Sequence, residues 1–314
     1  MKKTLVSMSL CLLAGGVLFS SCNKTEFDKS QKIKAYTRDS NSGTREGFME
    51  KIGYKDGSKD DSKLNARVER VASNGDMLSS LESQTYGIGY FSFDSKEEAA
   101  TKNIKILNFE GVEATEDTIL GGTYKLARDF NYCVAEETDE TKKLIVNAFV
   151  AFMSTSEGLA TIKANGGVCK VSTTTKSWNE IKANYAGIEN DHSSVTINFG
   201  GSTSVEKIAK ALSSQFKSLA GNFQANHNHT GSGDAYKKTQ GSEKGSLDIG
   251  FASRAFHTTS DEALTEGTYG KICVDGIVIG VSNKNPLTNI TADQAKAIYS
   301  VDDSTMNTWA DLIK

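Results

Sequence analysis

The chain has 314 residues, of which 38% are hydrophobic and 24% are charged, so it is long enough to bury the cores of two lobes. A formal net charge of -3 at pH 7 lacks the basic excess that nucleic acids and acidic membranes attract, and we expect neither as a partner. The single proline, Pro286, leaves the turns to the 28 glycines and to Asn, Asp and Ser.

The first residues read as an export signal. Two lysines form a charged start, and the apolar run 5–19 is too short to span a bilayer. Two serines then precede Cys22, an arrangement that resembles a bacterial lipoprotein cleavage site. We expect a signal peptide over 1–21, a lipid on Cys22, and a polar tether over 22–31. The alternative is an ordinary signal peptide that contains a cysteine.

The thiols and imidazoles of the mature chain predict neither a disulfide framework nor a metal site. Cys133, Cys169 and Cys273 are odd in number, so we expect small buried hydrophobic side chains. His227 and His229 alternate without a nearby Cys or acidic pair, which makes a poor zinc site. We therefore expect these histidines to be solvated, and we expect no metal and no cofactor.

Strand and helix patterns alternate in the front half of the chain. The pattern predicts strands over 32–37, 88–91 and 104–109, helices that carry Phe48 and Leu78, and a helix over 142–152. Residues 92–103 are charged and suit a crossing between lobes. The polar segment 174–194 lacks periodicity and suits a linker.

The back half repeats this alternation. A strand is predicted over 195–199 and a helix over 204–219, opened by a capping box at 203–206. Thr291 opens a later helix in the same way, and the run 274–281 is apolar enough for a strand covered on both faces. Strands that alternate with helices predict an α/β fold with mostly parallel sheets.

Small residues gather in three clusters that suit an oxyanion. The clusters 42–44, 202–204 and 231–233 combine glycines, which let the backbone approach closely, with hydroxyl donors. The first two precede predicted helices, whose N-terminal N–H groups and dipole attract anions. Arg38 and Ser253 add further donors. Any one cluster is more often a turn or a capped helix without a ligand, but together they predict an anion site.

The order of these motifs resembles a known family in rearranged form. Residues 38–45, Arg-Asp-Ser-Asn-Ser-Gly-Thr-Arg, resemble the Arg-x-x-x-Ser-Gly-Thr segment of the phosphate-binding proteins that feed phosphate ABC importers, and 87–90 is similar to the Ile-Gly-Tyr strand that follows it there. Residues 201–205 resemble the Gly-Ser-Thr-Thr-Val segment that opens those proteins. Further similar segments are 118–128, 152–158, 165–167, 231–233, 248–254, 275–277, 285–286 and 308–309. The family order places the back set first, so the chain resembles a circular permutation.

The resemblance implies a type II periplasmic-binding-protein fold, with two α/β lobes, a hinge and a ligand cleft between them. The permuted order assigns 32–96 plus 271–314 to the lobe with the Arg-x-x-x-Ser-Gly-Thr loop and 97–270 to the lobe with the Gly-Ser-Thr-Ser loop. The linker 174–194 would join the ancestral termini. The alternative is two half-domains that a second chain completes.

Ligand positions carry over from the family to Arg38, Ser42, Gly43, Thr44, Thr203, Ser204, Ser232 and Ser253. One departure concerns specificity, because some members place an Asp directly after the serine that corresponds to Ser253. That Asp accepts a proton from phosphate and helps to reject sulfate. Arg254 stands there in this chain and is expected to touch the anion or to pair with Glu262 or Glu266. Asp234 is the nearest substitute acceptor.

The resemblance implies a lipid-anchored, extracytoplasmic, non-enzymatic receptor for inorganic phosphate that acts as a monomer and docks on an ABC permease. A receptor of the same fold for another oxyanion is the first alternative. A surface sensing or adhesion protein that kept the fold is the second. A phosphatase-like enzyme ranks lowest, because the sequence shows neither a metal cluster nor an activated nucleophile.

Overall fold

The computed structural model describes residues 26–137, 139–303 and 305–313, so the expected signal peptide and Cys22 lie outside the described residues. The strands are β1 (Lys34–Arg38), β2 (Glu69–Val71), β3 (Gly87–Ser92), β4 (Ile104–Phe109), β5 (Ala127–Val134), β6 (Thr196–Gly201), β7 (Gln224–His229), β8 (Ile249–Ala252), β9 (Tyr269–Ser282) and β10 (Asn289–Ile290).

The α-helices are α1 (Gly43–Lys51), α2 (Asn74–Ser83), α3 (Lys96–Thr101), α4 (Glu116–Leu120), α5 (Glu140–Met153), α6 (Ser156–Ala164), α7 (Trp178–Ile181), α8 (Glu206–Lys217), α9 (Gly233–Thr239), α10 (Ala292–Tyr299) and α11 (Trp309–Leu312). Short 3-10 turns are η1 (Lys55–Ser58), η2 (Asp61–Lys63), η3 (Phe93–Ser95) and η4 (Lys182–Asn184). The α/β fold predicted from the sequence is confirmed. No single described helix is long and apolar enough to cross a membrane, although α5 and α6 reach that length together across a 72° bend.

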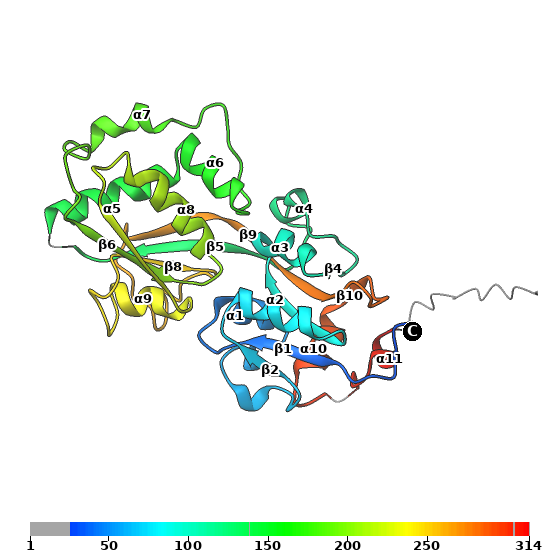
Figure 1. Cartoon of the computed structure of the whole chain (residues 1–314). Helices are drawn as coiled ribbons and strands as arrows, with labels where there is room; N and C mark the ends of the chain where they lie inside the picture. The colour runs from blue at the N-terminus through cyan, green and yellow to red at the C-terminus, as the bar shows by residue number, and fades with distance from the viewer. Residues whose placement is uncertain (1–25, 138, 304, 314) are drawn as a thin grey trace, which may run out of the picture.

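A single long strand runs through both halves of the molecule (Figure 1). The sheet order is β2-β1-β3-β9-β5-β8-β6-β7, with β4 and β10 attached to β9 outside this path. The first part of β9 pairs with β5 and its last part with β3 and β4, all antiparallel. The pairs β1–β2, β1–β3, β6–β7 and β6–β8 are parallel. The pair β5–β8 is antiparallel as well, so the middle of the sheet, from β3 through β9 and β5 to β8, is antiparallel and the parallel pairs lie at its two ends. The mostly parallel pairing predicted from the sequence is therefore wrong for the middle of the sheet.

Two hydrophobic cores divide the chain into lobes. We call residues 26–126 and 277–313 the first lobe and residues 127–276 the second lobe. In the first core, the rings of Phe48 and Tyr90 stack with centroids 3.9 Å apart. In the second core, Phe149 packs edge-on against Phe216. Each lobe buries its own apolar faces, so the junction between the lobes is left to polar side chains.

The predicted crossing at 92–103 is wrong. That segment forms η3 and α3, and the following strand β4 buries Ile104, Leu107 and Phe109 in the first core. The chain instead crosses at the start of β5 and returns along β9, which moves the lobe limits to 126/127 and 276/277. The charged residues of 92–103 cover the outside of a helix whose Ala99 is buried, a composition that a surface helix shares with a linker.

The segment 174–194 is packed rather than loose. It contains α7, and its Trp178 is 2% exposed and packs edge-on against Phe152 and Phe216 of the second core. The described part of the expected tether also packs, because Phe27 contacts the ring of Trp309. Nearby, Lys32 pairs with Thr308 in an antiparallel bridge. The two described ends of the chain therefore meet in the first lobe.

Candidate functional site

The N-terminus of α1 lies at the junction of the lobes. Ser42 caps this helix, accepting hydrogen bonds from the N–H groups of Thr44 at 3.2 Å and Arg45 at 3.3 Å. Gly43 follows it. A Cβ atom on Gly43 would lie 2.9 Å from the Oγ of Ser253 and closer still to the Oγ of Ser232, so only glycine fits this approach. The first turn of α1 therefore faces the serines of the opposite lobe directly.

Arg38 ends β1 and is 1% exposed. Its Nη1 donates to Asn74 at 3.0 Å, and its Nη2 donates to the carbonyl of Ala72 at 2.7 Å and to Thr203 Oγ1 of the second lobe at 2.9 Å. The Nε has no hydrogen-bond partner among the described residues. Burial lowers the pKa of Arg38, yet a guanidinium stays protonated in proteins. A buried cation with an unused donor therefore stands at the junction.

The loop before α8 crosses the junction with its hydroxyls. Ser204 Oγ lies 2.8 Å from Thr44 Oγ1, and Asn74 donates to it at 3.4 Å. The predicted capping box at 203–206 is wrong, because α8 begins at Glu206 and its N-cap, Val205, makes no side-chain cap bond. Thr203, the residue that would cap the helix, accepts a hydrogen bond from Arg38 of the other lobe instead.

The start of α9 and the end of β8 bring two more serines, Ser232 and Ser253, to the same junction. Ser232 precedes α9, and its Oγ lies 3.1 Å from the Oγ of Ser253 and accepts from the Ser253 N–H at 2.9 Å. The N–H of Gly233 donates to the carbonyl of Asn41 across the junction at 3.3 Å. The structure thus brings together, within one chain, the eight positions that the resemblance singled out: Arg38, Ser42, Gly43, Thr44, Thr203, Ser204, Ser232 and Ser253.

Asp234 is engaged by other groups. Its carboxylate accepts from the hydroxyl of Thr230 and from Lys238 Nζ at 3.0 Å. Burial alone would raise the pKa of Asp234, but hydrogen bonds from Thr230, Lys238 and Asn41 hold it below its ordinary value. Asp234 is therefore an ionised group at the edge of the junction, and its role as a proton acceptor stays a prediction.

Arg254 pairs with Glu262, one of the two outcomes expected from the sequence. Nη1 and Nη2 donate to the two carboxylate oxygens at 2.8 and 2.6 Å. Burial opposes the charge of Arg254, but the Glu262 carboxylate raises the pKa of the guanidinium above its ordinary value. Arg254 Nε also lies 3.0 Å from Glu46 of α1, a contact that the sequence did not predict.

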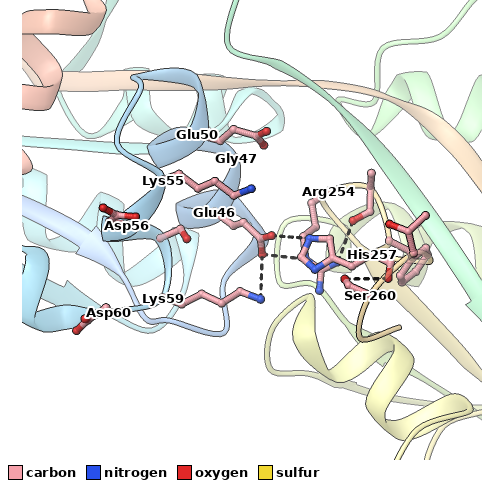
Figure 2. Close-up of a pocket in the computed structure, with 14 residues that line it drawn as sticks. Glu46, Gly47, Glu50, Lys55, Asp56, Lys59, Asp60, Arg254, His257 and Ser260 are labelled. Carbon is pink, nitrogen blue, oxygen red and sulfur yellow. Dashed lines mark hydrogen bonds and ion pairs between the residues drawn. The ribbon is translucent and has the colours of Figure 1, made fainter. Parts of the chain in front are cut away.

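A cleft of about 820 Å³ opens beside this pair. Figure 2 shows Glu46 reaching from α1 toward Arg254 and His257 of the second lobe. His257 Nε2 lies 2.8 Å from the Glu46 carboxylate. Sequence reasoning missed Glu46 and His257, because nothing in the pattern of either segment links residues so far apart in the chain. Their charges were the only signal.

The sequence predicted that His227 and His229 are solvated, and this prediction is wrong. They lie on β7, where the ring of His227 stacks on Phe199 with centroids 4.9 Å apart. Burial and the neighbouring His229 lower the pKa of His227 to about 4. His229 Nδ1 lies 3.1 Å from the carbonyl of Ser202, directly behind the loop before α8. The described residues contain no group of three or more side chains that could hold a metal ion.

Comparison with known proteins finds relatives that are phosphate-binding proteins. Residues 186–313 match the family model for the PBP superfamily domain. The chain is 27% identical over 313 residues to phosphate-binding protein PstS 2 of Streptococcus pneumoniae serotype 4, with 98% of both chains covered. It is 27% identical over 312 residues to PstS 2 of Streptococcus agalactiae serotype V, with 96% of this chain and 95% of the relative covered.

A solved structure gives the same result in three dimensions. It is the phosphate-binding protein of a phosphate ABC transporter from Streptococcus pneumoniae TIGR4, with a TM-score of 0.64 and 25% sequence identity. The match covers 90% of this chain and 100% of that chain.

Proposed function

We propose that this chain is a member of the phosphate-binding protein family of ABC transporters, and that it captures inorganic phosphate outside the cytoplasm and delivers it to an ABC permease. The relatives are binding proteins of transporters, and the proposed role is likewise binding without catalysis. The proposal accounts for a site built from hydroxyls, backbone N–H groups and one unpaired arginine.

The buried guanidinium of Arg38 carries the proposal. A buried charge is costly unless a partner of opposite sign or a full set of hydrogen bonds compensates it. Arg38 forms no ion pair among the described residues and keeps an unused Nε donor. An oxyanion beside Arg38 would supply both the charge and the acceptor. Phosphate, with four oxygens, matches a site that is rich in donors.

We assign the phosphate to the junction surrounded by the eight residues named above. Arg38, Ser42, Gly43 and Thr44 act from the first lobe, and Thr203, Ser204, Ser232 and Ser253 act from the second. Because donors come from both lobes, a bound anion holds the lobes together. Strands β5 and β9 are the connections through which the lobes would hinge.

We also propose that the chain is circularly permuted, monomeric and lipid-anchored. The closeness of Lys32 and Thr308 supports permutation, since permuted termini must lie near each other. Contacts such as that from Arg38 to Thr203 lie within one chain and support a monomer. The serines before Cys22 support the anchor. Labelling with a fatty-acid analogue should mark the wild type and spare Cys22→Ser, and equal labelling of both would refute the anchor.

Calorimetry on the purified mature chain tests the function. Titration with phosphate should give saturable binding at one site per chain, and native mass spectrometry should show one anion on a monomer. Absence of phosphate binding at millimolar concentrations would refute the proposal. A stoichiometry of one anion for two chains would instead favour the half-domain account.

A receptor for another oxyanion is the second candidate, favoured by Arg254. An arginine cannot accept a proton, so the proton acceptor that distinguishes phosphate from sulfate must be another group. If Asp234 is that group, Asp234→Asn should weaken the preference for phosphate over sulfate in competition calorimetry. An unchanged preference would refute that assignment, and a wild type that prefers sulfate would favour the second candidate.

A further inference from the structure

Glu46 faces an arginine and a histidine of the opposite lobe. It lies in the first turn of α1, with 17% of its side chain exposed. One carboxylate oxygen is 3.0 Å from Arg254 Nε, and the other is 2.8 Å from His257 Nε2 (Figure 2). Each oxygen therefore has its own partner, and both partners belong to the second lobe.

The second lobe holds these two side chains in fixed positions. Glu262 binds Arg254 through two hydrogen bonds and accepts from the N–H of His257 at 2.7 Å. Asp261 approaches the other imidazole nitrogen at 3.4 Å. Because Arg254 and Glu262 are both nearly buried, the loop presents its charges to α1 in one arrangement. Arg254 and His257 therefore need little further ordering when Glu46 approaches them.

The position of this contact ties it to the anion site. Glu46 follows Gly43 in the same helix turn, and Arg254 directly follows Ser253 in the chain. A closure that brings Gly43 against Ser253 must therefore also bring Glu46 to Arg254. We propose that Glu46 is a positioning residue that latches the closed state over the bound anion. This proposal rests on the proposed function.

A latch of this kind acts mainly on release. The pairs of Glu46 exist only when the lobes are closed, so they slow opening more than they speed the first encounter. Other charges face the same cleft, namely Lys55, Lys59, Glu50, Asp56 and Asp60. Lys59 Nζ is 3.9 Å from Glu46, too far for a hydrogen bond.

Stopped-flow measurements with inorganic phosphate on the mature chain test the latch. Glu46→Gln should raise the dissociation rate about tenfold and change the association rate by less than about threefold. Glu46→Asp, which keeps the charge, should recover part of the loss. Glu50→Gln is the matched control, because Glu50 lies on the same helix and the same cleft and has no ion pair among the described residues. Its rates should equal those of the wild type.

A double-mutant cycle separates a latch from a general loss of packing. Combining Glu46→Gln with His257→Gln should cost less than the sum of the two single changes. Small-angle scattering at saturating phosphate should show a larger radius of gyration for Glu46→Gln. Unchanged dissociation, tighter binding in Glu46→Gln, or additive effects would each overturn the latch. Failure of the wild type to bind phosphate would instead refute the function on which it rests.

Discussion

Two buried arginines stand at the junction of the lobes with opposite surroundings. Arg38 donates to an amide, a carbonyl and a hydroxyl, and no carboxylate forms an ion pair with it among the described residues. Arg254 faces two carboxylates, those of Glu262 and Glu46. The protein thus leaves one guanidinium in need of an anion and neutralises the other with its own side chains.

This difference suits the two arginines to different roles. Arg38 is suited to bind an anion, and Arg254 is suited to the contact between the lobes. A cation already paired with two carboxylates gains little from a phosphate, whereas an unpaired one gains much. Arg254 stands where the resemblance expects the proton acceptor of some family members, but its guanidinium contacts Glu262 and Glu46. The comparison therefore predicts that changes at Arg254 act mainly on stability, with an effect on phosphate release through Glu46, and that changes at Arg38 act on affinity.

The largest expected effect is on stability, in Arg254→Ala. Removal of this side chain leaves Glu262 buried without its partner, which should lower the free energy of unfolding by about 3–5 kcal/mol in urea denaturation. The double change Arg254→Ala with Glu262→Ala should regain part of the loss, since the buried carboxylate of Glu262 is then no longer left without its partner. Lys271→Ala removes an exposed pair with Asp129 and should cost less than about 1 kcal/mol. Equal losses for Arg254 and Lys271 would contradict the comparison.

Arg38→Ala should have the largest effect on affinity. Loss of a charged donor in a desolvated site should weaken phosphate binding by about 2–5 kcal/mol in calorimetry. Arg38→Lys keeps the charge but loses the planar fork, so its loss should be intermediate. Arg70→Ala, an exposed arginine on the neighbouring β2, should bind as the wild type does. Wild-type affinity in a folded Arg38→Ala variant would remove Arg38 from the site.

A third arginine, Arg128 of β5, belongs to a group of buried charges that should make the stability of the fold depend on pH. Arg128 binds Asp275 at 2.7 Å, and burial together with the charge of Asp275 raises the pKa of Asp94 to about 7. The folded state therefore holds a proton on Asp94 that the unfolded state releases near pH 4. This contribution to stability is present below pH 4 and is lost as pH rises toward 7.

Asp94→Asn should remove the loss of stability that Asp94 causes as pH rises toward 7. The variant should be more stable than the wild type by about 2–4 kcal/mol at pH 8, with a smaller difference at pH 4, as measured by urea denaturation at each pH. Asp302→Asn changes an exposed carboxylate and should leave the pH profile as it is. A parallel profile for Asp94→Asn and wild type would show that Asp94 is ionised in the folded protein at neutral pH.

Local patterns predicted those parts of the molecule that local physics determines. The cap at Ser42, the capping box at Thr291 and the doubly covered strand β9 all follow from short stretches of sequence. The eight site positions came from a resemblance, and the structure gathers them at one junction. The gathering itself needs the long-range pairing of β5 with β9, which no window of sequence contains.

The errors share one cause, which is competition from distant partners. Thr203 is a good capping residue by type, but Arg38 of the other lobe donates to its hydroxyl. Trp178 lies in a polar segment, but the aromatic rings of the second core bury it. In the sequence, Glu46 is an ordinary acidic residue in the first turn of a helix, where the helix dipole stabilises a negative charge. Only the folded arrangement shows that each of these residues serves another element.

The smallest expected effects come from the hydroxyls, and they sharpen the comparison between the lobes. Thr203→Ala removes one neutral acceptor from Arg38 and should weaken phosphate binding by about 0.5–1.5 kcal/mol with little change in stability. Ser42→Ala should weaken binding by a similar amount and should also lower stability by about 0.5–2 kcal/mol, because Ser42 caps α1. Thr155→Ala removes the cap of α6, away from the junction, and should lower stability alone. If Ser42→Ala behaves like Thr155→Ala, with affinity intact, its hydroxyl serves only the helix, and the first lobe binds the anion through Arg38 and backbone N–H groups.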